Sequence, residues 1–313
     1  EYPTSKLEII VVSDGSTDGT DRIVKEYENH GVKLIRQEPR AGKTSALNLA
    51  VSEARGEIIV FSDANSMYAP DSLRMLTRNF SSEKIGYVTG KMVYTYVDGS
   101  TTAEGCSAYM KYENILRELE TRVGSVVGVD GGIDAVRKEL YTTMKADQLP
   151  DFILPLKVVE QGYRVVYEPS ALLKEEALGK SKDEYRMRVR VALRALWAIA
   201  DMRQLLSVKR HGFFAVQLWS HKLLRYTCFI FLLTAYIANL WLWPHGIIYK
   251  LFFIIQNMAY MGALCSPIME KKGYSPGPLK YLAYFVLINC ASAHAFLKFV
   301  LRKKQVMWNP RKG

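Results

Sequence analysis

The sequence of 313 residues has few cysteines and lacks the glycine-rich loops that hold dinucleotides and nucleoside triphosphates. Its four cysteines have no paired spacing, so the sequence signals neither a disulfide framework nor a zinc site. No GxGxxG follows the first apolar run, and a Rossmann dinucleotide site thereby loses its main support. The segment Gly42-Lys43-Thr44 matches the last three residues of the P-loop motif, but Gln37 occupies the position where that motif requires its first glycine.

Acidic residues are scarce in the second part of the chain. The net charge is +11, yet residues 1–180 carry 22 basic and 27 acidic side chains, whereas residues 181–313 carry 20 basic and 4 acidic ones. A charge of +11 by itself would suit nucleic acid, an acidic membrane surface or an anionic substrate. Because the basic excess lies beside long apolar runs, we attribute most of it to a membrane surface and expect no nucleic-acid partner.

Three uncharged apolar runs occupy residues 226–243, 251–269 and 281–297. Each approaches the 18 to 20 residues that a helix needs to cross a bilayer. The alternative, buried helices of a soluble domain, would need more surrounding protein to cover them. We therefore expect about three transmembrane helices within 225–301, followed by a basic tail at 302–313. Three crossings would place that tail on the opposite side of the membrane from residues 1–180. If those residues are cytoplasmic, this arrangement is against the positive-inside tendency, so the third run is the candidate for a re-entrant or interfacial segment.

Residues 1–180 alternate short apolar runs with helical patterns, which is typical of a parallel α/β sheet. Each apolar run ends in a polar loop, and ligands of such sheets bind beyond the carboxyl ends of the strands. We expect strands at 7–12, 32–35, 57–61 and 163–167, a hairpin at 86–97 that turns at Asp98-Gly99, and helices at 18–28, 44–54, 70–80 and 103–121. Residues 181–224 are expected to form an arginine-rich helix at 182–206 and an amphipathic interfacial helix at 213–224.

Two carboxylates follow buried strands directly. Asp14 suits a hydrogen-bond acceptor for a base or a ribose, although on its own it would equally suit a helix cap. Asp63 follows the third strand, and Asn65 supplies a second oxygen two residues further on. Oxygen ligands suit Mg²⁺ or Mn²⁺, and either ion would bridge to phosphates.

Five ordered motifs resemble those of family 2 glycosyltransferases with a GT-A fold. The resemblance extends from residue 7 to about residue 200 and continues loosely to residue 308. The motifs are VSDGSTDG at 12–19, GKTSALN at 42–48, FSDAN at 61–65, VGVDGG at 127–132, and PDFIL at 150–154 with GYRVVY at 162–167.

The resemblance implies a fold class and a domain division. It implies an α/β GT-A unit, with the Rossmann-like mixed sheet of nucleotide-diphospho-sugar transferases, at residues 1–180. Arg-rich and interfacial helices follow at 181–224, and the α-helical membrane region comes after them. The usual first strand of this fold is absent before Glu1, so we expect the chain to be a fragment.

The resemblance also implies roles for individual residues. Asp151 takes the place of the catalytic base, and Asp63 that of the metal ligand, with weaker coordination by Asn65. Asp14, with Gly15 beside it, would contact the nucleotide base. The other expected substrate contacts are Lys43 near the nucleotide, Gly131 and Gly132 on the acceptor side, and Arg190 at the diphosphate. For Arg190, a solvated or lipid-facing charge is an equally open alternative.

Several positions depart from the family pattern. Asn65 replaces the second acid of the metal motif, and Pro150 precedes the expected base where an acidic residue is common. In processive members of the family the next helix carries a Gln and an Arg-Trp pair. This sequence has Met187, Arg190 and Val191 at those positions, so only the arginine matches. Lys91 and Glu113 are expected to be ordinary surface charges unless the fold places them in the cleft.

The expected activity is inverting transfer of a sugar from a nucleotide-diphosphate donor, most simply a UDP-sugar, to a lipid-linked or polysaccharide acceptor. The protein would be a multi-pass membrane protein with a cytoplasmic catalytic part, in contact with membrane lipids and dependent on Mg²⁺ or Mn²⁺. Direct displacement needs a carboxylate to take the acceptor proton and a cation to stabilise the leaving diphosphate. The alternatives are a sugar-nucleotide-binding protein that has lost catalysis, or a transport protein with a regulatory soluble part. No acidic residue in the three runs supports ion-coupled transport.

Overall fold

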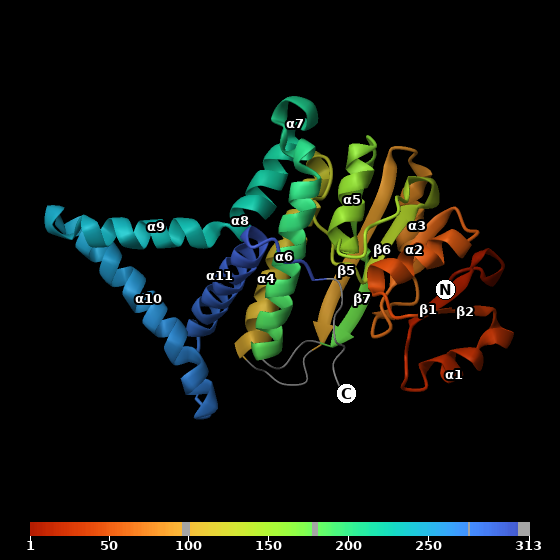
Figure 1. Ribbon diagram of the computed structural model, residues 1–313, viewed down its shortest axis with the longest axis horizontal. Helices are drawn as coiled ribbons and strands as arrows, with labels where there is room; N and C mark the ends of the chain where they lie inside the picture. Colours follow the sequence, from red (N-terminus) through yellow and green to blue (C-terminus); the bar gives the residue numbers. More distant parts are fainter. Residues whose placement is uncertain (96–100, 177–180, 275, 306–313) are drawn as a thin grey trace.

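The computed structural model describes residues 1–95, 101–176, 181–274 and 276–305 (Figure 1). Its strands form two sheets, a parallel pair of β1 with β2 and a five-stranded sheet in the order β3-β6-β5-β7-β4. In the larger sheet β5 and β7 are parallel, and the other pairs are antiparallel. The sheet is therefore mixed, as the family resemblance implies, and the parallel sheet expected from the alternating pattern is wrong for most of its pairs. The strands are β1 (Ile9–Asp14), β2 (Val32–Gln37), β3 (Ile58–Ser62), β4 (Met67–Tyr68), β5 (Ile85–Thr95), β6 (Ile133–Arg137) and β7 (Arg164–Glu176).

The expected hairpin after residue 86 is wrong, and the reason lies in how the sheet is assembled. Both edges of β5 are occupied by strands from far along the chain, with β6 on one side and β7 on the other. β7 pairs with β5 as far as Thr95, so on that side the end of β5 is bound by a strand distant in sequence and not by one that returns from a tight turn. The expected turn at Asp98-Gly99 lies outside the described residues, and the chain continues as helix α4 (Thr101–Val123).

The remaining helices of the α/β unit cover the strands, and α6 leads towards the membrane region. The expected helices and strands of residues 1–180 otherwise occur near their expected positions. The helices are α1 (Thr20–Lys25), α2 (Lys43–Glu53), α3 (Ser72–Thr77), α5 (Pro150–Glu160) and α6 (Ser181–Asp201).

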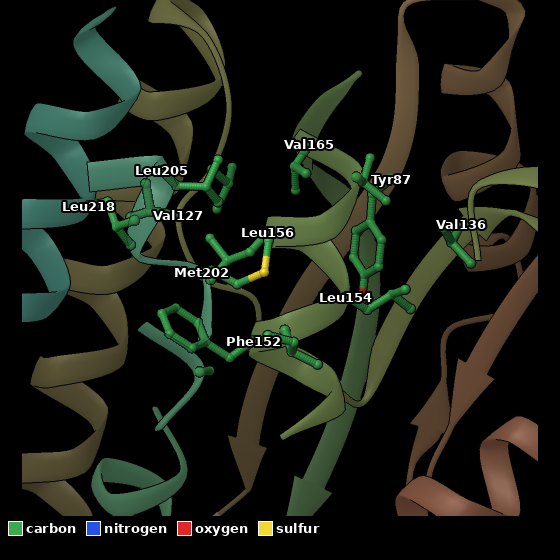
Figure 2. Packing of buried hydrophobic residues seen from close by; sticks show 14 of the residues in the cluster. Tyr87, Val127, Val136, Phe152, Leu154, Leu156, Val165, Met202, Leu205 and Leu218 are labelled. Atoms are coloured by element: carbon green, nitrogen blue, oxygen red, sulfur yellow. The ribbon is translucent and has the colours of Figure 1, made fainter. Parts of the chain in front are cut away.

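Helix α5 lies inside the core, between the sheet and the helices that follow α6 (Figure 2). Phe152, Leu154 and Leu156 are all buried, which is expected for a helix that is covered on every side. Tyr87 of β5 packs against it from the sheet, and Met202 packs from the chain after α6. Since α5 begins with proline at its first position, its first turn and the Asp151 within it are fixed at the edge of this core.

The second part of the chain is helical. α7 (Val208–Leu218) runs through the π-helical turn η6 (Trp219–Leu223) and α8 (Leu224–Tyr226) to α9 (Cys228–Trp241). Two further helices follow, α10 (Ile247–Lys271) and α11 (Leu279–Val300). α9 and α10 extend away from the α/β unit, whereas α11 lies beside α4 and α6 (Figure 1).

Two of the three apolar runs form helices long and apolar enough to cross a membrane, namely α10 and α11. The first run does not reach that length as one straight helix, because α9 has 14 residues. It qualifies as a third span only when α9 is joined to the preceding helical segment, from which it is bent by 60°. α11 is unbroken, so the interruption lies at the first run and not at the third.

Candidate active site

A cleft of about 3330 Å³ runs from the ends of β1 and β3, past the start of α5 and along α6, to α11. Seven of the nine expected site residues line it: Asp14, Gly15, Lys43, Asp63, Asn65, Asp151 and Arg190. The two expected acceptor-side glycines, Gly131 and Gly132, are not among the residues described as lining this cleft. Strand ends that are distant in sequence are thus brought to one place, as the α/β pattern predicts.

Asp14 ends β1 and organises the loop before α2. Its Oδ1 accepts hydrogen bonds from Gln37 Nε2 at 2.6 Å and from the Ala41 amide at 2.8 Å, and its Oδ2 accepts one from the Gly42 amide at 2.9 Å. Burial alone would raise the pKa of Asp14, but these bonds and the Arg40 charge lower it. The side chain therefore has a structural function in the loop, and its contact with a nucleotide base stays a prediction.

Lys43, the first residue of α2, lies between the two carboxylates of the site. Its Nζ is 2.6 Å from Asp63 Oδ1 and 3.9 Å from Asp151 Oδ1. Burial would lower the pKa of this lysine, but Asp151 and Asp63 raise it. Lys43 is therefore a permanent cation that joins the end of β3 to the first turn of α5.

Asp151 combines partial burial with access to the cleft. Its side chain is 27% exposed, and it stands in the first turn of α5. Burial raises its pKa, Asp63 raises it further, and the charges of Lys43, Arg194 and Arg190 oppose the rise. A carboxylate with a raised pKa that stays ionised is suited to accept a proton.

The expected metal ligands lie in the turn after β3. Asn65 Nδ2 donates to Glu175 Oε1 at 2.9 Å, so the amide oxygen is the atom of Asn65 that a metal would use. Glu175, near the end of β7, brings a second carboxylate to this turn, and the sequence analysis missed it. Across the described residues no three Asp, Glu, His or Cys side chains form a complete cation site. A site with so few protein oxygens is suited to Mg²⁺ or Mn²⁺, because such an ion would take its remaining ligands from substrate phosphates.

Gly131 and Gly132 lie beneath the site. Gly131 has a φ of 84°, and a Cβ at this position would collide with the carboxyl group of Asp151. A Cβ on Gly132 would lie 2.7 Å from Leu173 Cδ2 and 2.9 Å from Met92 Cε. Both glycines thus permit close packing, and the first lets the backbone approach Asp151.

Arg190 and Arg194 are one helical turn apart on α6, and both line the cleft. Arg194, which the sequence analysis missed, donates from Nη2 to Thr44 Oγ1 at 3.2 Å and also to the carbonyl of Gln148. It therefore connects α6 to the start of α2. Burial lowers the pKa of Arg190, and the charges of Asp151 and Asp63 oppose this fall, so Arg190 lies in the cleft near both carboxylates. Its contact with a diphosphate stays a prediction.

Glu113 corrects another expectation. It is 5% exposed and lines the cleft, although the sequence suggested a surface charge. Along α4 the buried residues include Met110, Glu113, Arg117 and Glu120, at spacings of three and four. This spacing places the four residues on one face of the helix. The sequence did not indicate that this face is buried, because three of the four residues are charged.

Comparisons with known proteins agree with this architecture. The family described as "Glycosyl transferase family 2" matches residues 1–104, and "Glycosyl transferase family group 2" matches residues 58–258. The mannosyltransferase of Pyrobaculum calidifontis, solved with GDP-Man and Mn²⁺, has a TM-score of 0.70 at 23% identity and covers 97% of this chain and 80% of its own. That likeness confirms the GT-A fold.

Two curated relatives are similar over part of their length. The beta-monoglucosyldiacylglycerol synthase of Nostoc sp. is 30% identical over 145 residues, which is 44% of this chain and 31% of that protein. The poly-beta-1,6-N-acetyl-D-glucosamine synthase of Staphylococcus epidermidis is 26% identical over 224 residues, 66% of this chain and 52% of that protein. The chain thus spans about a third to a half of these relatives. Because the second family match covers more than half of the chain, the chain belongs to the family 2 glycosyltransferases.

Proposed function

We propose that the protein transfers a sugar, with inversion, from a UDP-sugar to a lipid-linked or polysaccharide acceptor at a membrane. The observation that carries this proposal is the position of Lys43 between Asp63 and Asp151 in one cleft. This arrangement puts a candidate phosphate site and a candidate proton acceptor side by side. Direct displacement at the anomeric carbon needs both groups at once.

Asp151 is the proposed base. It would take the proton of the acceptor hydroxyl while that oxygen attacks the anomeric carbon from the face opposite the leaving diphosphate. Burial raises its pKa and so increases its affinity for that proton, whereas the charges of Lys43, Arg194 and Arg190 favour its ionised form. A single displacement of this kind inverts the configuration at the anomeric carbon.

The leaving diphosphate needs positive charge. Lys43 and Arg190 line the cleft beside Asp151 and are suited to contact phosphate oxygens. Asp63, with Asn65, would hold Mg²⁺ or Mn²⁺, which would neutralise charge on the departing phosphate when it is bound. Asp14 and Gly15 are the proposed contacts of the nucleotide base.

The names of the relatives support the substrate class. One relative is named for a glucosylated diacylglycerol and another for an N-acetylglucosamine polymer. Together with two helices of membrane-spanning length, they support an acceptor at the bilayer. The catalytic part is proposed to face the cytoplasm in a multi-pass protein.

A donor panel tests the proposal. The chain in lipid vesicles is incubated with UDP-glucose, UDP-N-acetylglucosamine, UDP-galactose and GDP-mannose, with and without Mn²⁺ or Mg²⁺, and released nucleoside diphosphate is measured. We expect metal-dependent release from one UDP-sugar, and product analysis should show the inverted anomer. Binding of donors without release from any of them would instead support the binding protein that lacks catalysis.

A further inference from the structure

Helix α4 and the π-helical turn η6 are joined by charged side chains that are nearly removed from solvent. Glu113 and Arg117 of α4 are 5% and 4% exposed, and Lys222 of η6 is 7% exposed. Charged residues are rarely buried to this extent unless they are paired. All three also line the cleft that contains Asp151.

Glu113 is the centre of this group. Lys222 Nζ lies 3.6 Å from its Oε2, Arg117 Nη2 lies 4.0 Å from the same oxygen, and Arg225 of α8 donates to Oε1. Burial alone would raise the pKa of Glu113, but these three cations hold it well below its usual range. Glu113 is therefore a permanent anion that connects α4 to the helical segment η6–α8.

The turn η6 makes a second connection to α4 through the residue before Lys222. His221 Nδ1 lies 2.5 Å from Glu120 Oε1. Two consecutive residues thus reach the same neighbouring helix from a π-helical turn, a rare geometry that is often found at functional positions. Around this turn Phe213, Trp219 and Leu224 are exposed, as expected for a segment in the membrane interface.

Arg117 continues the network into the loop that precedes β6. It holds Asp130 by two parallel bonds of 2.5 and 2.6 Å, and its Nε donates to the Gly128 carbonyl at 3.2 Å. The end of the Lys222 side chain occupies the space that a Gly128 side chain would take. Two cations, one from α4 and one from η6, thus fix this loop.

The same loop supports the proposed base. Gly131 follows Asp130 directly, and its backbone packs against the Asp151 carboxyl group so closely that no side chain would fit between them. A displacement of the loop would therefore displace the wall against which Asp151 rests. Contacts lead without a gap from Lys222 through Glu113, Arg117 and Asp130 to that wall.

We propose that Glu113 and Arg117 are positioning residues that tie the interfacial segment η6–α8 to the loop beneath Asp151, so that this segment sets the position of the base. The inference rests on the proposed function. A network built only for stability would gain little from its charges, because well-packed apolar residues often replace buried ion pairs without loss of stability. The two parallel bonds from Arg117 to Asp130, and the contact of the neighbouring Gly131 with Asp151, indicate that the network positions the base.

The test uses Arg117→Lys in the full chain in lipid vesicles. Lysine keeps the charge but cannot form the two parallel bonds to Asp130. We expect turnover to fall about 10- to 100-fold, the usual result of an ångström-scale misplacement. The number of sites for UDP with Mn²⁺ and their affinity, measured by calorimetry, should stay unchanged. A purely structural defect would reduce the number of binding sites.

Arg122→Lys is the matched control. Arg122 lies on the same helix and pairs with Glu118 at 2.6 Å, but its side chain is 69% exposed. We expect wild-type turnover from this variant. If Arg117→Lys does not fold, Asp130→Asn tests the same link with a smaller change in shape. Wild-type turnover in the folded Arg117→Lys or Asp130→Asn protein would overturn the inference.

A double variant tests whether the two ends of the network act together. If Lys222 and Arg117 act through one route, Lys222→Met combined with Arg117→Lys should lower turnover no more than the more damaging single change. Multiplied losses would contradict the shared route. If wild-type protein turns over no donor at all, the proposed function fails; if it is active and the variants match it, only this inference fails.

Discussion

Lys43 Nζ lies 2.6 Å from Oδ1 of Asp63, the carboxylate proposed to hold the metal. Lys43 opens α2 directly after the two backbone amides that Asp14 binds. The end of β1 therefore positions the lysine that reaches the end of β3 and the start of α5. Four strand-end and helix-start positions thus form one electrostatic unit.

Replacing Lys43 with Met should impair both donor binding and proton transfer. The lysine lowers the pKa of Asp151, so its loss should raise that pKa and move the acid limb of the kcat/KM profile to higher pH. Donor affinity should fall about tenfold through the loss of one charge-assisted contact. Lys33→Met is the control, since Lys33 forms a half-exposed pair with Glu53. An unshifted profile would contradict the electrostatic coupling.

Asp14→Asn should weaken the loop before α2. The hydrogen bonds lower the pKa of Asp14, so its ionised form stabilises the fold above its unfolded pKa of about 4, and this stabilisation is lost as pH falls through the folded value. We expect the variant to be less stable by about 1–3 kcal/mol at pH 7, with a smaller difference near pH 3. Thermal unfolding in detergent at both pH values measures this. An equal difference at both would show that the carboxylate charge is not the cause.

Gly131→Ala should abolish most activity. A methyl group would collide with the Asp151 carboxyl group, and the φ of 84° disfavours any side chain. We expect turnover to fall by about 100-fold or more, with a stability loss of about 1 kcal/mol. Gly124→Ala is the matched control, because a Cβ there meets nothing within 4 Å. Equal activity of the two variants would show that Gly131 does not support the base.

Asp134→Asn should stabilise the protein in mildly alkaline solution. Asp134 is 1% exposed in β6, and burial raises its pKa to about 7. The folded state therefore retains a proton that the unfolded state loses above about pH 4, so this carboxyl destabilises the fold increasingly as pH rises through that range. Asparagine does not ionise and so avoids this loss of stability. We expect the free energy of unfolding of the variant to exceed that of the wild type by roughly 1–4 kcal/mol at pH 8, and the difference to disappear near pH 4. Thermal unfolding at both pH values checks the sign, and a variant that is less stable at pH 8 would contradict it.

The mixed sheet and the place of Asp151 were implied only by the family resemblance, whereas local patterns were enough to predict an α/β unit and the convergence of Asp14 and Asp63 on one cleft. Strand ends in such sheets lie on one side, so the order of motifs already implied their proximity. The β5 hairpin was predicted wrongly because pairing with β6 and β7 depends on strands distant in sequence. Local propensity contains no information about such partners.

The buried network of α4 was missed for a different reason. Glu113 and Arg117 have the spacing of a buried helix face, but charged residues indicate a surface unless their partners are known. Their partners, Lys222 and Asp130, come from the π-helical turn η6 and from the loop before β6. Only the folded chain brings these residues together.

The central claim is that Asp151 takes the proton of the acceptor in a glycosyl transfer, and Asp151→Asn tests it most directly. Asparagine keeps the shape of the side chain but cannot accept a proton as a carboxylate does. With the donor that the panel identifies, we expect calorimetry to show donor binding close to that of the wild type and the assay to show a loss of turnover of about 100- to 10,000-fold. Near-normal turnover in this variant would contradict the assignment of Asp151 as the base.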